Sequence, residues 1–317
     1  MEDTAVLLAT FNGGPFLQQQ LDSLQQQTYR DYAIFIRDDG SSDNTCAIIS
    51  KFAALNDINC SVIQDGKGSL GACQNFNRLL ESALSDSRQF RFFAFCDQDD
   101  IWHPQKLEIT HQHLRALEIS SPCVPTLVRS DAQVVNEALE LIAASFWQNQ
   151  GVDAGDTRLK QLILRNTTIG CTAMINRRLA ELATPIPAQA IMHDWWITII
   201  AAAVGHIANI YRPLLKYRQH ASNALGVGPA GLRRLINREH WATRVFNNDD
   251  CSPLLPFAQA YELRERCSTM LDPISAETLA RLRDFQRFSH WKRRLTALRT
   301  GIFPRDPTRL VGLLLKL

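Results

Sequence analysis

The sequence lacks any hydrophobic run long enough to cross a membrane. A membrane-spanning helix needs about 18 or more apolar residues, and the best candidate, Ile197 to Val204, is far shorter. The opening Met1-Glu2-Asp3-Thr4 is acidic, and the apolar stretch Ala5 to Ala9 that follows is too short for the core of a signal peptide. We therefore expect a cytoplasmic protein without a transmembrane helix.

Metal-site and disulfide patterns of cysteine are also absent. The eight cysteines include no Cys-x-x-Cys pair, and most lie among apolar neighbours, so we expect reduced thiols in the interior. There is no internal repeat, and the short glutamine runs Gln18-Gln19-Gln20 and Gln25-Gln26-Gln27 are typical of a solvated helix face. What remains is a chain of 317 residues, 45% hydrophobic, which is enough to bury a sizeable core.

The first hundred residues alternate between strand and helix patterns. Apolar residues at helical spacing separate four runs typical of buried strands, at Ala5–Ala9, Tyr32–Arg37, Cys60–Ile63 and Arg91–Cys96. This rhythm predicts an α/β fold with a mostly parallel sheet and helices on both faces. Farther on, the pattern predicts helices at Pro104–Leu117 and Asp194–Val204. It predicts strands at Thr126–Val135, Cys171–Ile175 and Ile207–Tyr217.

Two acidic clusters directly follow predicted strands. Asp38 and Asp39 follow the second strand, and Asp97, Asp99 and Asp100 follow the fourth. Carboxylates at the carboxyl ends of parallel strands lie where such sheets bind ligands. Two carboxylates on one tight loop can hold a divalent ion, and Mg²⁺ and Mn²⁺ prefer oxygen ligands. The pattern therefore predicts metal-assisted chemistry on a nucleotide diphosphate.

The order and spacing of these motifs resemble inverting family 2 glycosyltransferases of the GT-A fold. Over residues 4–108 the resemblance rests on Thr10-Phe11-Asn12, Gln27-Thr28-Tyr29, Asp38-Asp39-Gly40-Ser41-Ser42-Asp43 and Asp97-Gln98-Asp99-Asp100-Ile101-Trp102. Farther along, His193-Asp194-Trp195-Trp196 is similar to the acidic motif of the family, and Tyr217 to Asn223 is similar to rhamnosyltransferases of surface polysaccharide assembly. The resemblance implies transfer of L-rhamnose from dTDP-rhamnose to a lipid-linked saccharide in O-antigen or capsule assembly.

On the nucleotide side, the resemblance implies that Asp39 accepts a hydrogen bond from the N3–H of uracil or thymine, so UDP- and dTDP-sugars both remain open. Thr10, Phe11 and Asn12 are expected to line the same cleft, with Asn75 nearby. Turn formation is the alternative for Asp39 and the residue before it, and helix capping is the alternative for Asn75.

On the phosphate side, the resemblance makes Asp99 the main ligand of Mg²⁺ or Mn²⁺, with Asp97 contacting the ribose or the metal. His220 is expected to bind the metal or to donate a proton to the β-phosphate, and Arg218 to pair with a phosphate. A structural histidine and a surface salt bridge are the alternatives for these last two.

Asp194 is the expected general base. In an inverting displacement, the base removes the proton of the acceptor hydroxyl on the side opposite the leaving group. An N-cap role is the alternative, and His193 stands where the family usually has Glu. Cys171, Trp195 and Trp196 are expected on the acceptor side, with a core position as the alternative for the tryptophans.

Two other classes share part of this pattern. A sugar-1-phosphate nucleotidylyltransferase also has a nucleotide-binding α/β sheet, but it is expected to carry an Arg- and Gly-rich loop after the first strand. The segment Ala9-Thr10-Phe11-Asn12-Gly13-Gly14 has no arginine. A phosphoacceptor receiver domain is much shorter and needs a later lysine on the sheet, which the pattern does not place.

The formal net charge of +2 is unevenly distributed. Residues 233–317 carry 16 Lys/Arg against 9 Asp/Glu, whereas residues 1–232 carry 18 against 23. We therefore expect a catalytic domain at 1–230 and a basic helical extension at 231–317. Membrane-surface binding, packing on the catalytic domain and a homodimer contact remain open for the extension, which ends in the apolar and cationic segment Ile302–Leu317. No nucleic-acid partner is predicted.

Overall fold

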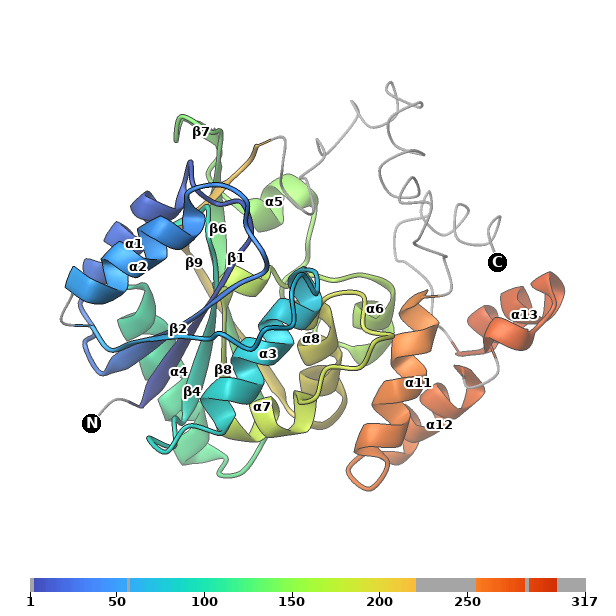
Figure 1. Ribbon diagram of the computed structural model, residues 1–317. Coiled ribbons are helices and arrows are strands. Elements are labelled where there is room, and N and C mark those ends of the chain that lie inside the picture. Colours follow the sequence, from blue (N-terminus) through green and yellow to red (C-terminus); the bar gives the residue numbers. More distant parts are fainter. Residues whose placement is uncertain (1–2, 56–57, 221–254, 283–284, 301–317) are drawn as a thin grey trace.

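The computed structural model describes residues 3–55, 58–220, 255–282 and 285–300. Within them, a nine-stranded sheet runs in the order β3-β2-β1-β4-β8-β6-β9-β5, with β7 paired to β6 (Figure 1). The strands are β1 (Thr4–Thr10), β2 (Tyr32–Asp38), β3 (Cys60–Val62), β4 (Phe92–Asp97), β5 (Ile101–Trp102), β6 (Thr126–Val135), β7 (Leu141–Ala143), β8 (Ala173–Asn176) and β9 (His206–Arg218).

Helices cover both faces of the sheet (Figure 1). They are α1 (Leu17–Gln25), α2 (Thr45–Leu55), α3 (Ala72–Leu84), α4 (Lys106–Ser120), α5 (Phe146–Gln150), α6 (Leu159–Leu164), α7 (Arg177–Ala183), α8 (His193–Val204), α11 (Leu255–Cys267), α12 (Pro273–Leu282) and α13 (His290–Thr300), with short 3₁₀ turns η1 (Gly170–Thr172) and η2 (Phe285–Arg287). Successive residues of β1 enter opposite cores: Leu7 packs with α3, α7 and α8, and Leu8 packs with α1, α2 and α4.

The parallel half of the sheet places the predicted ligand-binding edge as expected. β1 pairs in parallel with β2 and with β4, and the register sets Thr10 opposite Asp38 and Ala9 opposite Asp97. The carboxyl ends of three adjacent strands therefore meet at one edge. Because the strands are parallel, the loops that follow them all leave on the same side of the sheet.

The second half of the sheet is mixed rather than parallel. β8 lies antiparallel between β4 and β6, whereas β6 and β9 are parallel. The strand expected at Cys171–Ile175 begins only at Ala173, because Cys171 lies in η1. β9 runs through Pro213, and its pairing with β6 shifts register there, which accommodates a residue without a backbone N–H.

The described part of the basic extension packs on the sheet-bearing domain. α11 contacts α6 and α8, and Phe257 and Leu263 belong to the same apolar core as α8. Arg266 donates hydrogen bonds to the carbonyl oxygens of Leu182 and Pro185 at 3.3 and 2.9 Å. The segment expected to be apolar and cationic, 302–317, lies outside the described residues.

None of the helices in the described ranges combines the length and the apolar character that a membrane span requires.

A buried arginine ties together the elements around the carboxyl end of β2. Arg37 is only 2% exposed and donates to the carboxylates of Asp39 and Asp65 at 2.8 and 3.1 Å. The same guanidinium donates to Asn75 on α3 and to the carbonyl oxygen of Gly68, both at 3.1 Å. The pKa of Asp65 lies well below its usual range, mainly because of the hydrogen bonds from Arg37.

We predict that Arg37→Met lowers the free energy of unfolding by about 3 kcal/mol, because it leaves Asp39 buried without its ionic partner. The matched control is Arg78→Met, since Arg78 also pairs with Asp65, at 3.1 Å, but its side chain is 28% exposed. The control is expected to cost less than about 1 kcal/mol. Urea unfolding followed by fluorescence measures both, and equal losses contradict the assignment.

Candidate active site

The first acid after β2 is a turn residue. The carboxylate of Asp38 accepts hydrogen bonds from the hydroxyl of Thr10 at 2.9 Å and from the backbone N–H groups of Gly40 and Ser41 at 3.1 and 2.7 Å. Burial alone would raise the pKa of Asp38, but hydrogen bonds from the hydroxyl and the N–H of Ser41 and from Thr10 lower it. The turn alternative is therefore confirmed for Asp38, and the hydroxyl of Thr10 points into this turn.

The second acid, Asp39, is 3% exposed and already carries four donors. One oxygen accepts from Arg37 and from the N–H of Leu70, each at 2.8 Å. The other accepts from the hydroxyl of Ser69 and the N–H of Gly71, at 3.0 and 2.8 Å. A carboxylate has about four lone-pair sites, so a base N–H can reach Asp39 only if one of these bonds is exchanged. Nucleotide binding by Asp39 stays a prediction.

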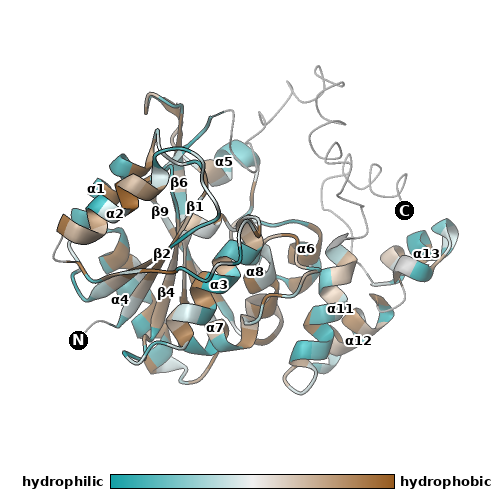
Figure 2. Cartoon of the chain, viewed as in Figure 1, coloured by the Kyte–Doolittle hydropathy of each residue, from teal (hydrophilic) through white to brown (hydrophobic). Residues whose placement is uncertain are grey.

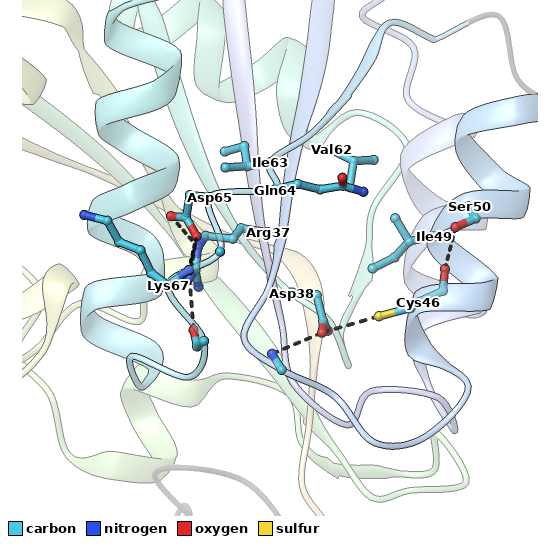
Figure 3. A pocket seen from close by; sticks show the side chains of 13 residues that line it. Arg37, Asp38, Cys46, Ile49, Ser50, Val62, Ile63, Gln64, Asp65 and Lys67 are labelled. Carbon is cyan, nitrogen blue, oxygen red and sulfur yellow. Dashed lines mark hydrogen bonds and ion pairs between the residues drawn. The ribbon is translucent and has the colours of Figure 1, made fainter.

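A cavity of about 250 Å³ opens beside this pair, between the carboxyl ends of β2 and β3 and the start of α2 (Figure 3). Ile49 and Val62 give it an apolar wall, whereas Asp38, Asp65 and Arg37 give it a polar one. This volume lies just below the range of about 300–1,000 Å³ that is typical of small-molecule sites, and the lining combines apolar and polar side chains.

The loop after β1 is clamped to both acidic loops. The backbone N–H of Phe11 donates to the side-chain oxygen of Gln98 at 2.8 Å, and the amide of Gln98 donates back to the carbonyl of Phe11 at 2.9 Å. Asn12 has a positive φ of 49°, and its side chain accepts from the N–H of Ser42 at 2.8 Å. Gln98 was not predicted, although it lies inside the Asp97–Asp100 motif.

Asn75 is not a helix cap. The N-cap of α3 is Gly71, and Asn75 is buried one turn inside the helix. Its amide donates to the carbonyl oxygen of Arg37 at 3.3 Å and accepts from the Arg37 side chain. Asn75 therefore holds α3 against the ends of β1 and β2. A direct contact with the nucleotide stays a prediction.

The acids after β4 are crowded and largely buried. Burial, together with the neighbouring charges of Asp99 and Asp194, raises the pKa of Asp97 to about 7. Asp100 is fully buried, accepts a hydrogen bond from the N–H of Arg218 at 3.2 Å, and has a pKa well above its usual value, chiefly because of burial. The position of Asp100 agrees with a role in fixing the loop.

Residues from the end of β9 return to this loop. The Nε2 atom of His220 lies 2.7 Å from a carboxylate oxygen of Asp99, and the imidazole packs on Phe16 with ring centroids 4.7 Å apart. Arg218 is 2% exposed and donates to the carbonyl oxygens of Asp99 and Glu137 at 2.8 and 2.7 Å. A surface salt bridge is therefore wrong for Arg218, and its contact with a phosphate stays a prediction.

This donor set fits Mg²⁺ or Mn²⁺. Asp97 and Asp99 offer carboxylate oxygens and His220 an imidazole nitrogen, and a cation placed among them relieves the repulsion that raises the pKa of Asp97. Among the described residues, the acidic and thiol ligand atoms that all lie within 4.8 Å of one another are instead those of Asp97, Asp100 and Cys171. The side chains of Asp100 and Cys171 are 0% exposed, whereas Asp97 and Asp99 are partly exposed.

Asp194 occupies the first turn of α8. The N-cap is Met192, so the N-cap alternative for Asp194 is wrong. Its carboxylate accepts from the side chain of Asn166 at 2.9 Å and from the N–H of Gly170 at 3.0 Å. Burial raises the pKa of Asp194 to about 6, against the lowering effect of these bonds. The charge of Asp194 also contributes to the raised pKa of Asp97, so the two carboxylates lie near each other.

Asn166 was not predicted, and no feature of the sequence singles it out. Its own oxygen accepts from the N–H of Thr168 at 3.0 Å. Arg129, fully buried on β6, donates to the hydroxyls of Thr167 and Thr168 at 2.7 and 2.8 Å. Arg129 therefore fixes the loop that carries Asn166 towards Asp194.

The residues expected on the acceptor side are mostly interior. Cys171 is 0% exposed and faces the carboxylates after β4, and Trp196 is 0% exposed and donates to the carbonyl of Ala183 at 2.9 Å. The core alternative is therefore confirmed for Trp196. Trp195 is partly exposed and donates to the carbonyl of Leu162 at 2.6 Å. A contact of these side chains with the acceptor stays a prediction.

His193 stands where the family usually has a glutamate, but it does not supply the charge of that glutamate. It is 2% exposed and stacks between Phe76 and Phe95, with centroids 3.9 and 5.1 Å away. Burial lowers its pKa to about 3, so the imidazole is neutral at physiological pH. Its ring occupies the space beside Gly170, where an added Cβ would lie 2.6 Å from Nε2.

Solved structures share the fold. A Staphylococcus aureus TarS fragment, 1–349, in complex with UDP-GlcNAc aligns with a TM-score of 0.52 and 16% identity, covering 96% of this chain and 93% of that one. A mannosyltransferase of Pyrobaculum calidifontis in complex with GDP-Man and Mn²⁺ aligns with a TM-score of 0.52 and 15% identity, covering 99% and 86%. The expected GT-A fold is confirmed.

Two named relatives are glycosyltransferases. The chain is 28% identical over 227 residues to the dTDP-rhamnosyl transferase RfbG of Shigella flexneri, covering 69% of this chain and 73% of that one. It is 27% identical over 176 residues to the UDP-Glc:alpha-D-GlcNAc-diphosphoundecaprenol beta-1,3-glucosyltransferase WfgD of Escherichia coli, covering 55% and 60%. These matches favour glycosyl transfer over the nucleotidylyltransferase and receiver alternatives.

The family model described as glycosyl transferase family 2 matches residues 5–182, a span that contains all the strand-end acids of the parallel half. Because that match covers more than half of the chain, this protein belongs to glycosyl transferase family 2.

Proposed function

We propose that this glycosyltransferase moves L-rhamnose from dTDP-rhamnose, with inversion, to a saccharide acceptor. The observation that supports this most is the buried Asp194 carboxylate, close enough to Asp97 to raise its pKa, in a chain similar to a dTDP-rhamnosyl transferase. The second relative is named for a diphosphoundecaprenol-linked acceptor, which supports a lipid-linked acceptor in surface polysaccharide assembly.

Asp194 is the base in this proposal. Its carboxylate removes the proton of the acceptor hydroxyl while that oxygen bonds to the anomeric carbon and the bond from that carbon to the diphosphate oxygen breaks. Asn166 and the N–H of Gly170 hold the carboxylate in place, at 2.9 and 3.0 Å. A pKa of about 6 leaves Asp194 mostly ionised at neutral pH and basic enough to accept the proton.

Asp99, His220 and Asp97 are the residues that would hold Mg²⁺ or Mn²⁺. The ion supplies neutralisation of the charge that accumulates on the departing diphosphate. The Nε2 atom of His220 and a carboxylate oxygen of Asp99 already lie 2.7 Å apart, so little rearrangement is needed for both to bind one metal ion. The main-chain hydrogen bond from Arg218 to Asp99 keeps this loop in place.

We expect purified protein to transfer sugar from dTDP-β-L-rhamnose and to form an α-linked product, because inversion changes the anomeric configuration. The measurement is a donor panel of dTDP-rhamnose, UDP-glucose, UDP-GlcNAc and GDP-mannose with Mn²⁺, with the linkage assigned by NMR. Efficient transfer from the UDP-sugars and none from dTDP-rhamnose overturns the donor assignment but leaves the glycosyltransferase assignment intact.

We expect Asp99→Ala to lower kcat by about 10² or more, because the charge on the leaving diphosphate is no longer neutralised. Chelation of divalent ions in the wild-type protein should have an effect of similar size. Asp22→Ala, which removes a carboxylate from α1 and its bond with Gln18, is the control and should leave kcat unchanged. Activity that survives both Asp99→Ala and chelation contradicts a metal-dependent reaction.

We expect Asp194→Asn to bind donor nucleotide normally and to lose transfer, because the amide keeps the shape of the carboxylate without its basicity. In the wild type, kcat/KM should rise with pH, since the base works only when deprotonated, and should level off above the Asp194 pKa of about 6. Near-normal turnover of Asp194→Asn places the base elsewhere.

Asn166→Ala provides a second test of the same base. In the wild type, the hydrogen bond from Asn166 stabilises the charged form of Asp194. Without that bond, the pKa of Asp194 should rise, and the acid limb of the pH profile should move to higher pH. Asn136→Ala, which removes a side chain that is hydrogen-bonded to Glu140, is the control and should leave the profile in place.

A further inference from the structure

One face of α13 is apolar and exposed to solvent. Trp291, Leu295 and Leu298 are 78%, 47% and 53% exposed. Their spacing of four and three residues brings them onto one side of a helix with 3.6 residues per turn. A soluble protein usually turns such a stripe towards its core. Here the stripe, which we call the α13 apolar face, points away from it.

The orientation of α13 is fixed by its opposite side. Ala297 and Thr300 are buried there. Arg293 donates to the carbonyl oxygen of Phe285 at 3.1 Å, and Arg281 of α12 donates to the carbonyl oxygen of Arg299 at 3.4 Å. The helix is therefore attached through the side opposite the apolar face, and it lies at the margin of the molecule, far from the edge formed by α1 and α2 (Figure 1).

Positive charge borders the apolar face on both sides. By helical geometry, Lys292 and Arg299 flank it on one side and Arg294 on the other. The whole segment 285–300 contains five Lys/Arg and no Asp/Glu. In Figure 2, α13 is accordingly mostly hydrophilic in colour with apolar positions between. Cationic side chains with apolar stems beside an exposed tryptophan are typical of a helix that lies at a membrane interface.

We propose that the α13 apolar face docks on an anionic lipid bilayer, with Trp291, Leu295 and Leu298 entering the headgroup region and the flanking cations binding lipid phosphates. Basic residues near an anionic leaflet gain attraction that an uncharged surface does not provide. A second copy of this chain is a poorer occupant, because a two-fold contact sets the same cationic face against itself.

The docking surface is independent of the chemistry proposed above. The face is formed by α13 alone, whereas the acids of the candidate active site lie at the ends of β2 and β4 and in α8. Substitutions on the face should therefore leave nucleotide binding, and transfer to a water-soluble acceptor, unchanged. Failure of this inference and failure of the proposed reaction can be told apart.

The test is flotation of the full chain with vesicles of phosphatidylcholine, with and without phosphatidylglycerol, at low and high salt. The wild type should float with the anionic vesicles at low salt and be released by salt, because screening weakens the electrostatic part of the binding. Leu295→Ser/Leu298→Ser should weaken this binding about tenfold or more. Leu141→Ser/Ile142→Ser on β7, where the side chains are 60% and 57% exposed, should not.

Charge is tested by a second matched pair. Lys292→Gln/Arg299→Gln should reduce binding to anionic vesicles, whereas Lys51→Gln/Arg115→Gln, which removes the same charge from exposed sites on α2 and α4, should not. Brominated lipid should quench the fluorescence of the wild type more than that of Trp291→Phe, because Trp291 is the residue expected in the bilayer.

Three outcomes overturn the proposal. The first is equal flotation of the α13 variants and their controls, and the second is binding to neutral and anionic vesicles alike with no effect of salt. The third is a dimer in sedimentation that Leu295→Ser/Leu298→Ser dissociates, with no vesicle binding by the wild type, which assigns the face to a second copy instead. Loss of folding is checked by circular dichroism and by retained nucleotide binding of each variant.

Discussion

The arrangement of this protein depends on holding like charges close together in a site that excludes most water. Asp97 and Asp99 follow β4, and Asp194 enters from α8, so three carboxylates face one region. Burial and mutual repulsion raise the pKa of Asp97 to about 7, and burial raises that of Asp194 to about 6. Such crowding is costly unless a cation or a proton offsets the charge.

The scaffold compensates for this crowding with contacts from distant parts of the chain. The antiparallel pairing of β9 with β5 returns Arg218 and His220 to the loop after β4, where one donates to its backbone and the other faces Asp99. On β2, Arg37 forms ion pairs with Asp39 and Asp65. The loops are held by buried cations and amides, so the site is shaped before any ligand arrives.

Local patterns predicted the parallel half of the sheet and the strand-end acids, because those features depend on residues a few positions apart. The partners of those acids depend on tertiary contacts instead. Asn166 contacts Asp194 although 28 positions separate them in the sequence, and Asn166 belongs to no recognisable motif. The carboxylate of Asp39 accepts hydrogen bonds from the loop before α3, and no turn pattern specifies these donors. Cys171, predicted on a strand, lies in a 3₁₀ turn with its thiol buried, because the chain bends before β8.

The helices after the sheet are connected to the chemistry through packing. α11 contacts α8, and the guanidinium of Arg266 lies 5.6 Å from the ring centroid of Trp196, two residues beyond Asp194. α12 and η2 join the same apolar core, and α13 attaches to them. These contacts connect α13 through packing to the helix that carries the proposed base. If α13 binds a bilayer as proposed, a lipid-anchored acceptor would meet the protein in fewer orientations, and such restriction lowers the entropic cost of the encounter.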